Sequence, residues 1–212
     1  MAQQERAVQT RRSILLGAAQ VFDEYGYDAA SIKEILVRAQ VTKGALYFHF
    51  PSKEELARGV LQEQTVYLDI PENVSKLQEL IDLTMAVAHM LPVSPLLRAG
   101  LRLAMERGSV DFSDSNPLLA WAGVCGGLLE KAKGLGEVLA QVDAKETAEM
   151  LVASFAGVQT FSQAATNLAD MEERVSVLWR HLLPTIALPA TLVRLDAASG
   201  RGARVLAMAG QD

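Results

Sequence analysis

Residues 31–50 of the chain, SIKEILVRAQVTKGALYFHF, have the pattern of two short helices joined by a tight turn. Ser31 is followed three residues later by Glu34, a capping-box pair that predicts a helix start. Apolar residues then recur at helical spacing and form one stripe. Gln40 and Val41 interrupt this pattern, so we expect the first helix to end there.

The second helix of this stretch is predicted to begin at Lys43, with Thr42 as its N-cap. Leu46 and Phe50 lie four residues apart and would anchor the helix in a core. Gly44, in the first turn, costs about 1 kcal/mol relative to alanine in a helix interior. Because glycine is unfavourable in a helix, its presence here suggests that another molecule approaches the backbone closely at this position.

This helix has the features of a DNA-reading element. A short helix with small residues at its start can enter the major groove. There Lys43 would reach guanine acceptors or a phosphate, and Thr42, Tyr47 and His49 offer donors to phosphate oxygens. Lys53 begins the next predicted helix, where free N–H groups favour an anion. An ordinary helical hairpin with solvated polar side chains fits the same spacing, so the spacing alone does not decide.

Charge gives only weak support for nucleic-acid binding. The chain has 212 residues and a net charge of −5, and residues 1–60 carry eight Lys/Arg against seven Asp/Glu. Such a small excess does not by itself predict DNA binding. Arg6, Arg11 and Arg12 precede or begin the first predicted helix. They would contact phosphates or enter the minor groove as a basic arm, and a solvated helix start is the alternative for each.

The composition predicts a cytoplasmic protein. Half of the residues are hydrophobic, which is enough for a sizeable core. Cys125 is the only cysteine, so an intrachain disulfide is excluded and a cysteine-based zinc site is not expected. The N-terminal segment MAQQERAVQTRR is polar, unlike a signal peptide, and no apolar run is long enough to predict a membrane span.

The rest of the chain predicts further helices and no strand, so the expected fold class is all-α, with about nine or ten helices. Residues 66–75 and 108–117 are rich in turn residues and read as loops. The expected helices, besides the two above, are 7–25 with Gly26 as C-cap, 53–64, 74–91, 96–107, 118–134, 143–165, 170–187 and 189–208.

Several residues in the C-terminal part have two interpretations each. Trp121 offers a flat apolar face and one N–H donor to a ligand, but it also fits ordinary core packing. His89 is either a ligand contact or a core histidine with a satisfied hydrogen bond, and Met85 also fits as core filler. Three glycines within the helix 118–134, at 123, 126 and 127, either permit close helix packing or leave room for a ligand.

Two stretches, VTKGALYFHFPSKEELA and RAVQTRRSILLGAAQVFDEYGYDAASIKEI, closely resemble the DNA-binding region of the tetracycline-repressor (TetR) family of transcription regulators. Four later stretches resemble the γ-butyrolactone receptor subgroup, whose members regulate antibiotic production in filamentous actinomycetes. These stretches are LLRAGLRLAM, the Trp121 segment NPLLAWAG, SFAGVQTFSQ and LLPTIALP.

The resemblance implies a domain boundary and a DNA-binding surface. It implies a helix-turn-helix domain over 1–52 and a larger helical domain over 53–212 for ligand binding and dimerisation, with 53–64 as the connecting helix. The DNA-binding residues that we expect are Arg11, Ser31, Lys33, Thr42, Lys43, Gly44, Ala45, Tyr47, Phe48, His49 and Lys53.

The resemblance also implies a pocket for a small amphipathic ligand in the C-terminal domain. In γ-butyrolactone receptors, the tryptophan that matches Trp121 packs against the ligand, and Gln64 and Ser154 match positions associated with ligand contact. The ligand-binding residues that we expect are Gln64, Met85, His89, Leu101, Trp121, Val124, Leu128, Ser154 and Val158.

The function implied is that of a homodimeric repressor. It would bind a pseudo-palindromic operator and be released by a γ-butyrolactone or butenolide-type signal. A related regulator that answers to an antibiotic is the alternative. The dimer contact is expected from helices 143–165 and 189–208, with small residues such as Ala153, Ala156, Gly157 and Ala164. An enzyme is not expected, because the three histidines are far apart and no catalytic or metal-site motif is present, so neither a metal nor a cofactor is expected.

Overall fold

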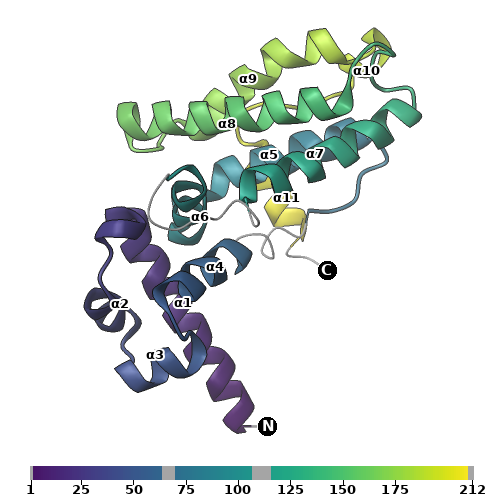
Figure 1. Ribbon diagram of the computed structural model, residues 1–212. Coiled ribbons are helices and arrows are strands. Elements are labelled where there is room, and N and C mark those ends of the chain that lie inside the picture. The colour runs from purple at the N-terminus through teal and green to yellow at the C-terminus, as the bar shows by residue number, and fades with distance from the viewer. Residues whose placement is uncertain (1, 64–69, 107–115, 210–212) are drawn as a thin grey trace. The chain divides into compact units, whose positions relative to one another are not determined.

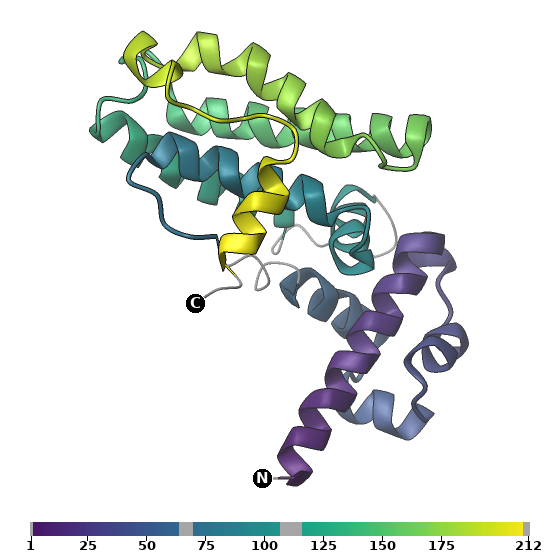
Figure 2. The same cartoon turned by 180° about the vertical axis from the view of Figure 1, so that it is seen from behind.

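A computed structural model describes residues 2–63, 70–106 and 116–209 (Figures 1 and 2). Regular structure in these residues is helical throughout, except for one isolated antiparallel bridge between Val138 and Ala187. The expected all-α fold class is therefore confirmed. The loop predicted over 108–117 falls largely outside the described residues, as does Gln64.

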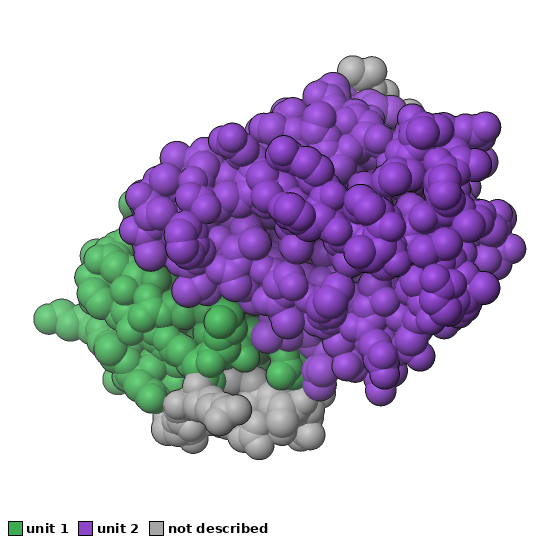
Figure 3. Space-filling view, turned by 90° about the horizontal axis from the view of Figure 1, so that it is seen from above, with its two compact units in different colours: residues 1–67, 94–117 green, residues 68–93, 118–212 purple. Residues whose placement is uncertain are grey.

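Two compact units divide the chain (Figure 3). Unit 1 comprises Met1–Tyr67 and Ser94–Pro117, and unit 2 comprises Leu68–Val93 and Leu118–Asp212. Unit 1 is thus larger than the predicted 1–52 segment, because α4 (Lys53–Glu63) and α6 (Pro95–Met105) bury apolar residues in its core. Capping signals mark where a helix begins but not which core it joins. A functional boundary at residue 52 stays a prediction.

Unit 1 begins with three helices, α1 (Ala2–Ala29), α2 (Ile32–Ala39) and α3 (Lys43–His49). The predicted N-caps are confirmed. The Ser31 hydroxyl accepts the Glu34 N–H at 3.2 Å, and the Thr42 hydroxyl accepts the Ala45 N–H at 3.2 Å. Gln40 takes a left-handed conformation between α2 and α3, with φ of 55°.

Gly26 was expected to end the first helix, and this expectation is only partly right. The helix continues to Ala29, but Gly26 has φ of 76° and ψ of 178° and introduces a kink. Glycine reaches this region of φ without the steric cost of a Cβ. The sequence signal therefore marks a change of direction in α1 rather than its end.

The core of unit 1 forms where α1, α2, α3, α4 and α6 meet. Leu46 and Phe50 are both buried in it, as their spacing predicted. Other buried members include Ile14, Leu15, Ala18, Phe22, Ile35, Leu56, Val60, Leu96, Ala99 and Leu103. This core fixes the inner face of α3 and leaves its outer face exposed.

Unit 2 is built around α5 (Lys76–Met90), which is buried along most of its length. The other helices are α7 (Pro117–Gly134), α8 (Ala144–Thr166), α9 (Met171–Ile186), α10 (Pro189–Leu192) and α11 (Arg201–Ala209). Helices α9 and α11 both pack on α5. Trp179 of α9 is fully buried, and its indole N–H donates to the Thr84 hydroxyl at 2.7 Å.

A single last helix over 189–208 was predicted, and this prediction is wrong. Pro189 does begin a helix, but α10 ends at Leu192 and α11 starts only at Arg201. Between them, the Asp196 carboxylate accepts the Ala198 N–H at 3.1 Å, and Gly200 has φ of 85°. Side-chain bonds of this local kind compete with helical hydrogen bonds.

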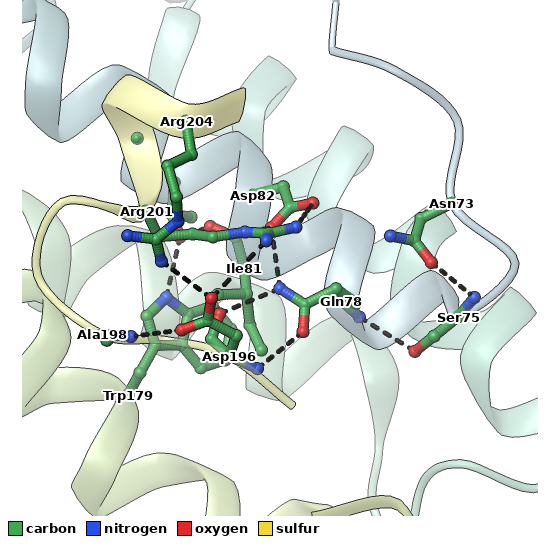
Figure 4. Close-up of polar contacts among 12 residues, drawn as sticks. Asn73, Ser75, Gln78, Ile81, Asp82, Trp179, Asp196, Ala198, Arg201 and Arg204 are labelled. Carbon is green, nitrogen blue, oxygen red and sulfur yellow. Dashed lines mark hydrogen bonds and ion pairs between the residues drawn. The ribbon is translucent and has the colours of Figure 1, made fainter. Parts of the chain in front are cut away.

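Contacts with α5 also hold this C-terminal segment, as the close-up in Figure 4 shows. Gln78 exchanges two hydrogen bonds with the backbone of Asp196, at 2.8 and 2.9 Å. Arg201 forms a bidentate ion pair with the buried Asp82: its Nε and Nη2 atoms donate to the two carboxylate oxygens, each at 2.8 Å. Gly202 lies so close to α5 that a Cβ there would collide with the Met85 carbonyl.

Within the described residues, no single helix has both the length and the apolar character needed to cross a membrane. Only α5 and α6 taken together, across the break between them, have enough length and hydrophobicity.

Candidate DNA-binding surface and ligand pocket

Helix α3 presents most of the predicted DNA-binding residues on one exposed surface. Leu46 is fully buried and fixes the helix on the core, whereas Tyr47 is 40% exposed and Phe48 is 83% exposed. Lys43 and Gly44 are exposed at the start of the helix. Two adjacent aromatic side chains exposed together form an apolar surface of the kind at which another molecule can bind.

The side chains on this surface are partly ordered by one another. The Lys43 ammonium lies 5.9 Å from the centre of the Tyr47 ring, and the rings of Phe48 and His49 meet edge to face at 5.2 Å. Among the residues that the structure describes, no heavy atom of another part of the chain would lie within 4 Å of a Cβ at Gly44. The backbone at Gly44 is therefore open to an approaching phosphate or base.

The remaining predicted DNA contacts surround α3. Ser31 and Lys33 are exposed at the start of α2, and Thr42 and Ala45 form the first turn of α3. Ser31 and Thr42 already use their hydroxyls as caps, and each hydroxyl retains its own proton for a phosphate.

Two basic residues predicted to contact DNA already have partners inside unit 1. The Arg11 guanidinium lies 3.6 Å from the Glu63 carboxylate and 5.2 Å from the centre of the Phe50 ring. Lys53 donates to the Asp28 carbonyl at 3.3 Å and lies 4.6 Å from the centre of the Tyr27 ring. Burial lowers the pKa of Lys53. For both residues, contact with DNA stays a prediction.

Unit 2 contains a pocket of about 430 Å³ between α5 and α7. Two of the predicted ligand-binding residues, Val124 and Leu128, line it, together with Ile70, Glu79, Leu83, Gly123, Gly127 and Lys131. The lining thus combines apolar side chains with one carboxylate and one ammonium group, and a small amphipathic molecule needs both kinds of contact.

The three glycines of α7 have two different structural roles. A Cβ at Gly126 would lie 3.7 Å from the Ala148 Cβ, so Gly126 packs against α8. Gly123 and Gly127 line the pocket, and no described residue outside their own helix turn would lie within 4 Å of a Cβ at either position. Close helix packing therefore explains Gly126, whereas room for a ligand at Gly123 and Gly127 stays a prediction.

The two charged residues of the pocket differ in their surroundings. Glu79 accepts hydrogen bonds from the Lys76 ammonium at 2.7 Å and from the Asn73 N–H at 3.0 Å. Lys131 is exposed, and its ammonium has no hydrogen bond or ion pair with any residue that the structure describes. Glu79, Leu83 and Lys131 were not predicted. The spacing from Val124 to Lys131, two helical turns, was the available signal for Lys131.

The other predicted ligand-binding residues do not line this pocket. Met85 is fully buried, and His89 Nδ1 lies 3.1 Å from the Glu172 carboxylate. Leu101 belongs to α6 in unit 1. Ser154 and Val158 are half-buried on α8. Gln64 lies outside the described residues.

Trp121 is half-buried on α7, and helical spacing places it on the same face as Val124 and Leu128. It therefore stands one turn before the lining residues rather than among them. The cysteine of the same helix, Cys125, is buried, and burial raises its pKa to about 12, which suits an inert core residue.

Comparisons with known proteins identify the family of both segments. Residues 14–60 match the family described as bacterial regulatory proteins, tetR family, and residues 74–187 match the tetracyclin repressor-like C-terminal domain. The chain is similar to the A-factor receptor protein of Streptomyces griseus, with 44% identity over 195 residues, covering 92% of this chain and 70% of the relative.

Two solved structures extend the similarity to the fold. Full-length native TylP, a TetR regulator from Streptomyces fradiae, is 45% identical, with a TM-score of 0.86 over 99% of this chain and 93% of that one. An ArpA-like γ-butyrolactone receptor is 30% identical, with a TM-score of 0.71 over 95% of this chain and 99% of that one.

Both the helix-turn-helix segment and the C-terminal segment thus match, and relatives in the family are regulators that bind operator DNA and small molecules. The resemblance seen in the sequence is confirmed: this chain belongs to the TetR family of bacterial regulatory proteins.

Proposed function

We propose that this protein is a homodimeric repressor whose α3 helices read a pseudo-palindromic operator and which a γ-butyrolactone or butenolide-type molecule releases from DNA. The main support is the exposed surface of α3 around Lys43, Tyr47 and Phe48 in a chain 44% identical to the A-factor receptor protein. The similar γ-butyrolactone receptor structure supports the ligand class.

The pocket between α5 and α7 is the proposed ligand site. Its volume of about 430 Å³ falls in the range of small-molecule sites. Leu83, Val124 and Leu128 would contact an acyl chain, and Lys131 would donate to a carbonyl or hydroxyl oxygen. Trp121 would cover the ligand from the same face of α7.

A dimer contact through α8 and α9 is part of this proposal. Phe161 is 62% exposed, Met150 is 49% exposed and Val177 is 38% exposed, and all three lie on these two helices. Ala153, Gly157 and Ala164 are exposed as well, as a close helix contact requires, whereas Ala156 is buried within the subunit. The second segment predicted for this contact, 189–208, is not a continuous helix, and its α11 part packs on α5.

Ligand release follows from differential binding. A ligand can shift the protein between two conformations only by the difference in its affinity for them. The ligand must therefore favour a conformation in which the two α3 helices no longer match successive major grooves.

A second candidate is a related regulator that responds to an acidic antibiotic. The Lys131 ammonium lies at the pocket beside Val124 and Leu128 and has no partner among the described residues, so it could pair with an anionic ligand. A neutral lactone would only accept hydrogen bonds from the Lys131 ammonium, whereas a carboxylate or phenolate would also form an ion pair with it.

The test first selects, from a pool of random duplexes, the DNA that the purified protein binds. The selected DNA is then titrated with protein, and binding is followed by fluorescence anisotropy. We expect a palindromic consensus and loss of binding on addition of a synthetic 2-acyl-γ-butyrolactone. Release only by acidic antibiotics would favour the second candidate, and failure to enrich any sequence would contradict the proposal.

A Trp121→Ala variant tests the ligand site separately. It should bind the selected operator like the wild type but need a higher lactone concentration for release, because it lacks the indole face. Leu135→Ala, at another exposed residue just beyond α7 and outside the pocket lining, is the matched control. If Trp121→Ala releases at the wild-type concentration, Trp121 does not contact the ligand.

A further inference from the structure

The kink in α1 lies directly before the DNA-reading helices. Gly26 departs from helical geometry, Tyr27 to Ala29 complete the helix, and Ser31 caps α2. The direction in which the chain leaves residues 26–31 therefore decides where α2 and α3 lie on the core of unit 1.

Charged side chains of α6 bind the backbone on both sides of this kink. Glu106 accepts the Tyr27 N–H at 2.7 Å, and the Arg102 guanidinium donates to the Asp23 carbonyl at 2.6 Å. Arg98, one turn earlier, pairs with the Asp23 carboxylate at 2.8 Å. Arg98 and Arg102 of α6 and its C-cap residue Glu106 are spaced four apart, so the three side chains lie on one side of the helix.

The two backbone groups that α6 binds have a particular relation to each other. In an uninterrupted α-helix, the N–H of residue 27 donates to the C=O of residue 23. Here that donor is bound by Glu106 and that acceptor by Arg102, and the two side chains are themselves joined at 2.9 Å. An Arg102–Glu106 ion pair thus occupies the place of one helical hydrogen bond.

The local sequence fits this insertion. A Cβ at Gly26 would collide with the Glu106 carboxylate and come within 3.1 Å of the Arg102 guanidinium. Gly26 is buried, and its φ of 76° is one that residues with a side chain rarely adopt. Glycine at position 26 therefore provides both the conformation and the space for the ion pair.

We propose that Arg102 and Glu106 are positioning residues for operator binding: their ion pair holds α1 kinked and thereby fixes α2 and α3 in the arrangement that reads DNA. Without the pair, a kinked α1 would leave a partly buried donor and acceptor unsatisfied, which is costly. A straight α1 would satisfy them and redirect the chain into α2. Lys53 of α4 supports the same turn through the Asp28 carbonyl.

The proposal also gives the ligand signal a route to the DNA-reading helices, and in this respect it rests on the proposed function. Helix α5 contributes Glu79 and Leu83 to the pocket, and α6 follows it after residues 91–94. A ligand that moves α5 would pull on α6 through this short connection and so strain the ion pair at the kink.

The test compares Glu106→Ala, Glu106→Gln and Gly26→Ala in the full-length protein, with Met105→Ala as the matched control. Met105 is the neighbouring residue of α6 and is 50% exposed. The readouts are affinity for the selected operator, measured well below the melting temperature of every variant, and amide hydrogen exchange in α2 and α3. Both Glu106→Ala and Gly26→Ala should weaken operator binding by about tenfold or more and speed exchange in α2 and α3, with no change in unit 2.

Conservative replacement and non-additivity separate positioning from general stability. Glu106→Gln keeps an oxygen acceptor for the Tyr27 N–H and should retain most of the affinity. It also provides a folded variant if Glu106→Ala unfolds. The double variant Gly26→Ala/Glu106→Ala should lose little more than either single variant, because both remove the same interaction.

The proposal would be overturned if folded Gly26→Ala or Glu106→Ala matched Met105→Ala in operator affinity and in exchange of the α2 and α3 amides, or if Glu106→Gln lost as much affinity as Gly26→Ala. If the wild type binds its operator and the variants bind it equally well, only the proposed role of the ion pair is rejected. If the wild type selects no DNA, the proposed function fails, and the exchange measurement still decides whether the ion pair orders α2 and α3.

Discussion

Gly44 and Gly202 show how the same residue type serves different purposes in this molecule. Gly202 is required by packing, because a Cβ there would collide with the Met85 carbonyl. Gly44 has open space around it, so no packing contact within the described part of the chain requires glycine there. The sequence predicted that an outside molecule approaches Gly44, and the structure leaves room for one.

Gly44→Ala should therefore change stability and DNA binding in opposite directions. Stability should rise by up to about 1 kcal/mol, because alanine is the better helix former. Operator affinity should fall, because the new methyl group would meet the DNA. Thermal unfolding and operator titration measure the two effects. Operator affinity equal to that of the wild type would show that DNA does not approach the backbone at this position.

Lys43 and Tyr47 allow a second prediction for single residues. Lys43→Ala and Tyr47→Ala should each weaken operator binding by about 1–3 kcal/mol, as expected for a contact to a base or phosphate, while the circular dichroism spectrum stays helical. Lys145→Ala is the matched control, because Lys145 is an exposed lysine on α8. Unchanged operator affinity in both variants would contradict the assignment of α3 as the DNA-reading helix.

Helix α11 illustrates a contact between elements that depends on a buried ion pair (Figure 4). The side chains of Asp82 and Arg201 are 5% and 17% exposed. Arg201→Ala should destabilise the protein by about 3 kcal/mol, because it leaves a buried carboxylate with one partner fewer. Chemical unfolding of this variant measures the loss, and Asp82→Ala/Arg201→Ala should recover part of it.

Arg204→Ala provides the control for that prediction. Arg204 pairs with Asp196 at 2.8 Å, but its side chain is 51% exposed, so its loss should cost less than about 1 kcal/mol. Equal effects at Arg201 and Arg204 would mean that burial does not strengthen the ion pair with Asp82.

At the scale of elements, the sequence predicted local features well and long-range ones poorly. The caps at Ser31, Thr42 and Asp143 each depend on residues three apart, and all three are present. The break between α10 and α11 was missed because it depends on Gln78 and Asp82, more than a hundred positions earlier in the chain. Helix propensity contains no information about such partners.

The candidate sites show the same difference between local and long-range features. The α3 surface was predicted because a contiguous stretch forms it. The pocket was predicted only in part, since Val124 and Leu128 share a face of α7, whereas Glu79 and Leu83 come from a different helix. The contact of the Arg102–Glu106 ion pair with α1 was not foreseen, because α6 was expected in the C-terminal domain rather than in unit 1.

For the whole molecule, assembly is the first property to test. Phe161→Glu should convert the proposed dimer into monomers, because it places a charge in an apolar contact, and operator affinity should fall with the loss of the second α3 helix. Analytical ultracentrifugation measures the association. Val193→Glu is the control, because Val193 is 84% exposed outside α8 and α9. A Phe161→Glu variant that stays dimeric would exclude Phe161 from the contact.

The most direct test of the proposed ligand-released repressor measures the coupling between ligand and operator from both sides. Operator affinity is measured by anisotropy with and without a saturating γ-butyrolactone, and lactone affinity is measured by calorimetry with and without the operator duplex. If one protein binds both, the two ratios must be equal, because coupling between two binding sites is reciprocal. We predict that the lactone and the operator weaken each other's binding by the same factor, of about 5–150. Tight binding of both with a factor of one would contradict the account, since the protein would then bind DNA and ligand without being a switch.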